Sequence, residues 1–211
     1  LALREGEPAA LLELAIELAA NLPLMPCDIS KAERGYRLFD AASYSLSLPA
    51  PDLLPEQSLD DAFAALAWHL LGSSQRLAEQ YRFNGHWKLL EQWLQQLTDL
   101  RALLSSLGQA APRASSHLLR EALDALLKDW RPLLQAGQQD AQRRQDAPAR
   151  FAEELGNTRW GHFSLQASLW LLQRQWVSTR NERGSRQGQA PLGKWLPRLL
   201  AAEVADLPLK R

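Results

Sequence analysis

Large apolar residues recur at alternating steps of three and four along most of this chain, which is the spacing of one face of an α-helix. The clearest run lies between Asn84-Gly85 and Gly108. It consists of Leu90, Trp93, Leu97, Leu100, Leu104 and Leu107. A seam of this kind is typical of a helix in an antiparallel bundle. We therefore expect a helix here that ends at Gly108.

Comparable seams predict helices before and after this one. The preceding helix is expected to start at Ser58, a good N-cap residue, and to run to Asn84. Its apolar positions are Leu59, Phe63, Leu66, Leu70, Leu77 and Tyr81. The following helix is expected to begin near Ser115-Ser116 and to break near Gly137. Its apolar positions are Leu119, Leu123, Leu126, Trp130 and Leu133.

A further helix is predicted after Asn157-Thr158, because both residue types suit a helix N-cap. Its apolar positions are Leu165, Leu169, Leu172 and Trp176. The polar stretch Arg143–Asp146 is expected to be a solvated turn, and residues 181–189 are expected to be a loop. Residues 191–204 are predicted to form a last short helix that starts properly at Pro197.

The N-terminal part has a different pattern. Residues 8–21 predict a first helix, because Pro8 suits a first helical turn and one face is apolar. That face is expected to consist of Leu11, Leu14, Ala15 and Leu18, widened by Leu12 and Ile16. Residues 40–57 contain three prolines among small and polar residues, which indicates a linker. The chain as a whole is thus predicted to be all-α, an antiparallel helical bundle with a shorter N-terminal piece.

The amino-acid composition disfavours several classes of protein function. Hydrophobic residues make up 46% of the chain, with many Leu and Ala and few β-branched residues, which favours helices. The 24 basic residues are balanced by 24 acidic ones, so extensive nucleic-acid binding is disfavoured. The single cysteine, Cys27, provides neither a disulfide framework nor a metal-ligand cluster. Without a bilayer-length apolar run or a signal-peptide pattern, the expected location is the cytoplasm.

Candidate binding residues are cations near predicted helix starts, where free backbone N–H groups attract anions. One group is Arg113, His117 and Arg120, and the other is Arg159 with His162. The alternative that these are ordinary solvated helix ends remains open. The four histidines are far apart and lack the paired spacing of zinc ligands, so no metal site is expected.

A short motif after the first helix carries a resemblance to a known family. Residues 30–38 read Ser-Lys-Ala-Glu-Arg-Gly-Tyr-Arg-Leu and follow the proline-rich break Leu22–Pro26. This order resembles the end of a CYTH domain, the triphosphate tunnel fold. The helical region that follows, including residues 157–165, resembles the first bundle of a CHAD (conserved histidine α-helical) domain. Together they resemble the bacterial inorganic triphosphatases that join a CYTH domain to a CHAD domain.

The resemblance implies three segments: residues 1–39 as the C-terminal edge of a CYTH domain with a short α/β remnant, residues 40–57 as a linker, and residues 58–211 as an incomplete CHAD-like bundle. The parent protein would hydrolyse inorganic triphosphate with Mg²⁺ or Mn²⁺. Lys31 would contact triphosphate and Arg34 would help anchor the segment; alternatively, both fix the domain edge by salt bridges. The metal-binding Glu-x-Glu-x-Lys strand of that family is not found in these 211 residues. We therefore expect this chain to contain no catalytic residue and no resident cofactor.

CHAD domains are associated with polyphosphate binding through a basic second helix, of which Arg101 is the basic residue kept here. The expected function is therefore a phosphate- or polyphosphate-binding accessory module of a triphosphatase-like protein, with inorganic polyphosphate or triphosphate as its ligand. The alternative is a helical scaffold that binds a protein partner or braces a neighbouring domain without binding phosphate. Neutral net charge supports this alternative, and no membrane partner is expected.

Overall fold

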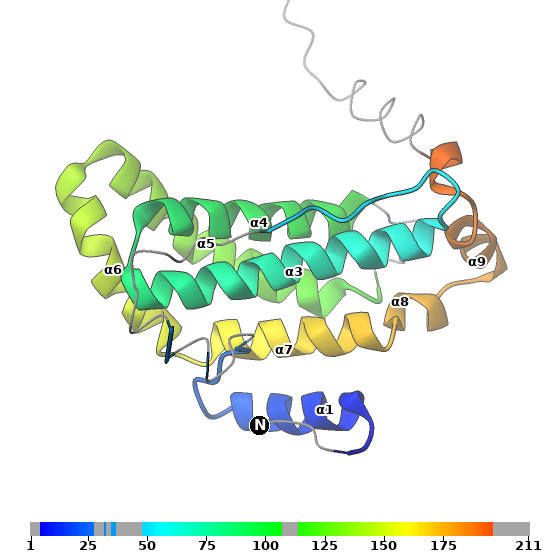
Figure 1. Ribbon diagram of the computed structural model, residues 1–211, viewed down its shortest axis with the longest axis horizontal. Helices are drawn as coiled ribbons and strands as arrows, with labels where there is room; N and C mark the ends of the chain where they lie inside the picture. Colours follow the sequence, from blue (N-terminus) through cyan, green and yellow to red (C-terminus); the bar gives the residue numbers. More distant parts are fainter. Residues whose placement is uncertain (1–4, 28–31, 33–34, 37–47, 107–113, 196–211) are drawn as a thin grey trace, which may run out of the picture.

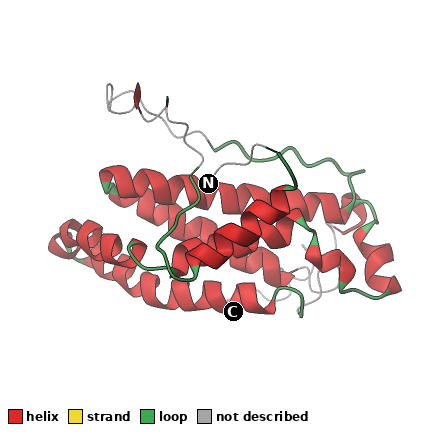
Figure 2. Ribbon diagram, turned by 90° about the horizontal axis from the view of Figure 1, so that it is seen from below, coloured by secondary structure: helices red, strands yellow, loops and turns green. Residues whose placement is uncertain are grey.

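The computed structural model describes residues 5–27, 32, 35–36, 48–106 and 114–195, and their secondary structure is almost entirely helical (Figures 1 and 2). The long helices lie alongside one another, with α6 at one end and α1 along α7 (Figure 1). They are α1 (Pro8–Ala19), α3 (Leu59–Asn84), α4 (Trp87–Ser106), α5 (His117–Gln139), α6 (Ala141–Leu155) and α7 (Arg159–Leu172). Two short helices follow, α8 (Gln175–Ser178) and α9 (Glu182–Gly188). The prediction of an all-helical chain is confirmed for these residues.

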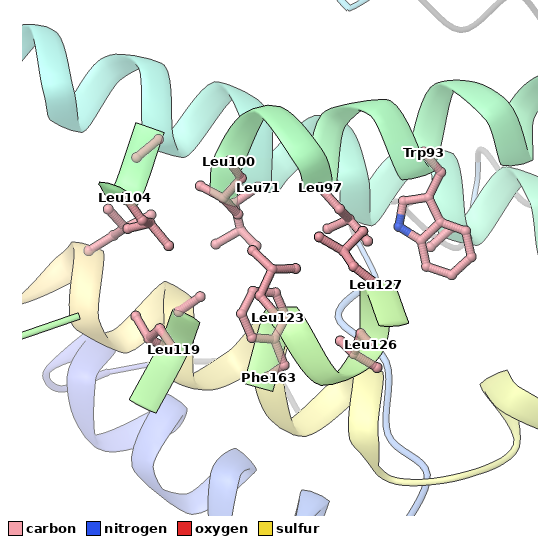
Figure 3. Close-up of a cluster of buried hydrophobic side chains, with 14 of the residues drawn as sticks. Leu71, Trp93, Leu97, Leu100, Leu104, Leu119, Leu123, Leu126, Leu127 and Phe163 are labelled. Carbon is pink, nitrogen blue, oxygen red and sulfur yellow. The ribbon is translucent and has the colours of Figure 1, made fainter. Parts of the chain in front are cut away.

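The core lies between α3, α4, α5 and α7. On α4, the predicted seam from Leu90 to Leu104 is buried. Figure 3 shows the α4 side chains Leu97 and Leu100 pointing toward Leu123 of α5. Each large apolar side chain buried in this way contributes roughly 1.5–3 kcal/mol relative to exposure, so the seams supply much of the driving force for folding.

Aromatic rings fill one end of this core. The Trp93 ring lies 4.9 Å from that of Trp130 and 5.2 Å from that of Trp160, measured between ring centroids. Phe151 of α6 and Tyr81 of α3 complete the group at 5.8 Å from each other. Tilted and edge-on pairs of this kind add about 0.5–1.5 kcal/mol each beyond the area that they bury. The tryptophans are therefore packing residues that join five helices.

The ends of α3 match the sequence prediction. The Ser58 hydroxyl accepts a hydrogen bond from the Asp61 backbone N–H at 3.1 Å, as an N-cap does. At the other end Gly85 has φ 64°, a left-handed conformation that glycine adopts without steric cost. The Gly85 N–H donates to the Tyr81 carbonyl at 2.7 Å and closes the helix.

Two predicted breaks are wrong. The helix α5 continues through Gly137 to Gln139, and the Trp87 ring packs directly against Gly137 where a larger residue would place its Cβ. Gly137 therefore serves helix packing rather than helix termination. The stretch Arg143–Asp146 lies inside α6 instead of a turn, because the Asp140 side chain caps that helix by accepting from the Gln142 N–H at 2.8 Å.

The region after α7 also differs from the prediction. Arg174 has φ 47°, which ends the helix, so Trp176 lies on α8 and Leu172 is 41% exposed. Residues 182–188, predicted as part of a loop, form the helix α9. Its N-cap is Asn181, whose side-chain oxygen accepts from the Gly184 N–H at 2.9 Å. The local capping signal was present in the sequence, but the absence of large apolar residues concealed a helix of this length.

The apolar face predicted for α1 is wrong in part, because Ala15, Leu12 and Ile16 do face the core but Leu14 and Leu18 do not. Ala15 and Ala19 are buried against Leu165 of α7, whereas Leu14 and Leu18 are 47% and 37% exposed. Small residues let the two helices approach closely, and hydrophobicity alone favoured the larger leucines. The backbone of Leu24, beyond the end of α1, lies directly over Gly161 of α7.

Several predictions fall outside the described residues. They are the strand at residues 1–4, most of the motif at residues 30–38 and the helix end at Gly108. The last helix was expected to start properly at Pro197, but residues 192–195 are already helical. Within the described part of the chain, none of the helices combines the length and apolar character needed to span a membrane. The expected linker is described from Leu48 onward, and Leu48 packs against the core.

Candidate anion-binding surfaces

The start of α5 carries two of the predicted cations. His117 is exposed and its Nδ1 lies 3.2 Å from a carboxylate oxygen of Glu121, one helical turn later. The Arg120 guanidinium donates to the Ser116 hydroxyl at 3.2 Å. His117 is thus matched with a carboxylate of its own helix, and Arg120 bonds back to the residue that precedes the helix.

Arg101 of α4 is held in place by Asp124 of α5. Its Nε and Nη2 donate to the two carboxylate oxygens at 2.7 and 2.8 Å, and a third N–H donates to the Ser105 hydroxyl. A bidentate pair of this kind fixes the guanidinium plane. The Arg101 side chain is 27% exposed, so one edge of it still meets solvent.

Three arginines act on the single carboxylate of Asp124. The hydrogen bonds from Arg101 hold the pKa of Asp124 below its usual value; partial burial opposes this shift, and the positive charges of Arg101, Arg120 and Arg131 reinforce it. Arg131 also donates to the Thr98 hydroxyl of α4 at 3.3 Å. The structure therefore brings Arg101 and Arg120 to one face of the α4–α5 pair and adds Arg131. We call this group, Arg101, Arg120 and Arg131, the α4–α5 arginine row.

Arg131 was missed by sequence reasoning, although a signal was available. Arg120, Asp124 and Arg131 are separated by four and seven residues, which places all three on one side of α5. Arg120 and Arg131 are eleven residues apart, so their Cα atoms are separated by about 16 Å along the helix. The row is therefore extended rather than compact.

Arg159, at the start of α7, lies apart from the α4–α5 arginine row. Its Nη1 lies 2.8 Å from Asp129 of α5 and 3.6 Å from Glu154 of α6. Asp129 follows Asp124 by five residues, which is a rotation of about 140° around the helix. Arg159 is therefore on another side of α5 and is surrounded by two carboxylates. Arg159 therefore does not lie together with Arg120 on one binding surface.

Of the remaining predicted residues, the structure describes His162. His162, three residues after Arg159, is half-buried within α7. Arg113, Lys31 and Arg34 lie outside the described residues. Among the described residues there is no group of three or more His, Cys, Asp or Glu side chains that fits a metal ion.

Comparison with known proteins supplied no relative. No protein-family model matches the sequence, and no curated protein matches it.

Proposed function

We propose that this chain is a CHAD-type accessory module that binds inorganic polyphosphate on the α4–α5 arginine row, within a cytoplasmic CYTH–CHAD protein of the triphosphatase kind. The parent would use Mg²⁺ or Mn²⁺ in a catalytic part beyond the residues described. One observation carries the proposal: three arginines from two helices lie close enough to Asp124 for their positive charges to lower the pKa of its carboxyl group. Guanidinium groups suit phosphate because their N–H donors match its oxygens in pairs.

The shape of the row favours a long anion over a compact one. Arg120 and Arg131 are about 16 Å apart along α5, with Arg101 held between them by Asp124. A single phosphate reaches one of these side chains at a time, whereas a phosphate chain lying along the α4–α5 seam reaches all three. Polyphosphate chain length should therefore raise affinity through simultaneous contacts.

Asp124 has a definite part in this proposal. It orients Arg101, and it also limits the local charge excess, so binding should be weak in high salt where the remaining attraction is screened. Counter-ions released from a bound polyanion make affinity fall steeply with salt concentration. The neutral net charge of the chain adds no long-range attraction to compensate.

The proposal can be tested by titrating the full chain with long-chain polyphosphate at low and high salt. We expect saturable, salt-weakened binding that falls at least about tenfold in Arg120→Gln/Arg131→Gln, because two charge-assisted contacts are lost. The matched control is Arg143→Gln/Arg150→Gln, which removes the same charge from exposed positions of α6. Equal loss in both variants would indicate general charge attraction and refute a site on the row.

The second candidate is a helical scaffold without phosphate binding. One observation favours it: His117 and Arg159, both expected to meet an anion, are each paired with carboxylates. If the chain does not bind polyphosphate at low salt, the phosphate-binding proposal is refuted and the scaffold is favoured. If the chain instead braces a catalytic tunnel, triphosphatase turnover of the parent should fall when residues from 58 onward are removed.

A further inference from the structure

A second group of cations lines a cleft beside α9, which lies at the end of the long helices opposite α6 (Figure 1). Arg183 and Arg186 project from α9, and Lys194 and Trp195 come from the segment that follows Pro191. The cleft has a volume of about 230 Å³. This is below the roughly 300–1,000 Å³ of pockets that hold drug-sized ligands, so a compact occupant fits better.

The cleft contains basic groups without acidic ones. Arg183, Arg186 and Lys194 all line it, and no carboxylate does among the residues that the structure describes up to Trp195. In the part of the chain that the structure describes, none of these three side chains forms an ion pair. Three cations converging on one small volume repel each other, and an anion between them removes that repulsion.

Two carboxylates at the start of α3 near this region are already neutralised. Asp60 and Asp61 begin α3 beside this region, but each is bound by a different arginine. Asp60 pairs with Arg180 in a buried contact, with 2.8 Å between Nη1 and Oδ1. Asp61 pairs with Arg174 at 2.8 Å, and hydrogen bonds from Ser58 and Arg174 hold its pKa below the usual value. Neither carboxylate therefore cancels the charge of the cleft.

Both walls of the cleft are fixed to the body of the protein. The α9 wall is tied to α3 through the Arg180–Asp60 pair, over which Gly188 packs so closely that a Cβ would collide with both side chains. The other wall is tied by backbone hydrogen bonds from Leu192 to Gln57 and from Gly193 to Pro55, both of 2.8 Å. Side chains mounted on fixed walls lose less entropy when a ligand binds.

We infer that this cleft binds a compact, multiply charged phosphate group, with tripolyphosphate as the representative ligand. The two arginines grip phosphate oxygens through their forked N–H groups, and Lys194 supplies the third charge. This site is separate from the α4–α5 arginine row and does not depend on it. The row suits an extended chain, whereas the cleft suits a short one.

The test is calorimetric titration of the full chain with sodium tripolyphosphate. We expect one saturable site whose Kd rises about tenfold or more in Arg183→Gln/Arg186→Gln, because two charge-assisted contacts are lost. The variant Arg183→Lys/Arg186→Lys keeps both positive charges but loses the paired N–H donors of the guanidinium groups. Its Kd should therefore lie between the Kd of the unaltered chain and that of Arg183→Gln/Arg186→Gln. Unchanged melting temperatures would show that each variant is folded.

Controls separate this proposal from simple charge attraction and from the proposed polyphosphate surface. The Kd should remain within about twofold of the unaltered chain in Arg143→Gln/Arg150→Gln and in Arg120→Gln/Arg131→Gln, since neither pair lines the cleft. Citrate, a tricarboxylate, should bind more weakly than tripolyphosphate. The inference is overturned if tripolyphosphate shows no saturable binding, if citrate binds as tightly, or if a control pair weakens binding as much as the cleft pair.

Discussion

Replacing Arg180 by methionine should destabilise this protein more than any exposed arginine replacement. The Arg180 and Asp60 side chains are 2% and 10% exposed, and two parallel hydrogen bonds join them. The Asp60 carboxylate also accepts from the Trp176 indole N–H at 3.3 Å. In Arg180→Met the carboxylate keeps that neutral donor and loses the cation, so a buried charge is left without its counter-charge.

The expected loss follows from this burial. Removing one partner of a buried ion pair costs about 3–5 kcal/mol, because the remaining charge stays out of water without compensation. An exposed pair such as Arg143–Asp140, 3.8 Å apart, contributes only about 0–1 kcal/mol. Arg143→Met should therefore lower the free energy of unfolding by at most about 1 kcal/mol and serves as the control.

Urea unfolding of a double-mutant cycle measures the pair directly. Arg180→Met and Asp60→Asn should each destabilise strongly, and the double variant should lose less than the sum of the two, by about 2 kcal/mol. This result is expected because the double variant leaves no buried charge unpaired. Additive losses, or a loss below about 1 kcal/mol in Arg180→Met, would refute the idea that the pair anchors α9 to α3.

Three other predictions concern packing and pH. Gly161→Ala places a Cβ against the Leu24 backbone, so it should cost about 1–3 kcal/mol and expose the α1 segment to limited proteolysis. Gly137→Ala should displace the Trp87 ring and lower stability by about 1 kcal/mol in urea unfolding, despite the better helix propensity of alanine. Burial raises the pKa of Tyr81 to about 12. The folded protein therefore retains a proton that the unfolded chain releases near pH 10, and the free energy of unfolding should fall between about pH 10 and 12 by up to about 1.4 kcal/mol per pH unit.

Each of these three predictions has an outcome that would contradict it. Gly72→Ala, with nothing within 4 Å of the added Cβ, should be neutral or stabilising, and an equal loss there would remove the packing argument for Gly161. A Gly137→Ala protein as stable as the unaltered chain would show that the Trp87 ring moves away without cost. For alkaline pH, Tyr81→Phe should lack the extra slope, and identical slopes in both proteins would contradict the raised pKa.

The candidate site could be predicted from the sequence only in part. Arg101 and Arg120 were named from the sequence, and the structure does bring them to one face. Arg101 was named from the family resemblance, whereas Arg120 and Arg159 were both named as cations at helix starts. Arg159 lies on another side of α5 among carboxylates. Helix starts can be predicted from capping residues, whereas the acidic partner of each arginine comes from a different helix and depends on how the helices pack.

Residue spacing by itself determined the long helices α3, α4, α5 and α7, because a repeat of 3.6 residues leaves its mark wherever one face of a long helix is buried. Tertiary structure alone decided which face is buried when small residues compete with large ones, as Ala15 and Ala19 do on α1. It also decided the neutralisation of charges, since Arg180 meets Asp60 across 120 residues of sequence. Apolar periodicity is a local property, but close approach and charge pairing depend on distances between segments that the order of residues does not state.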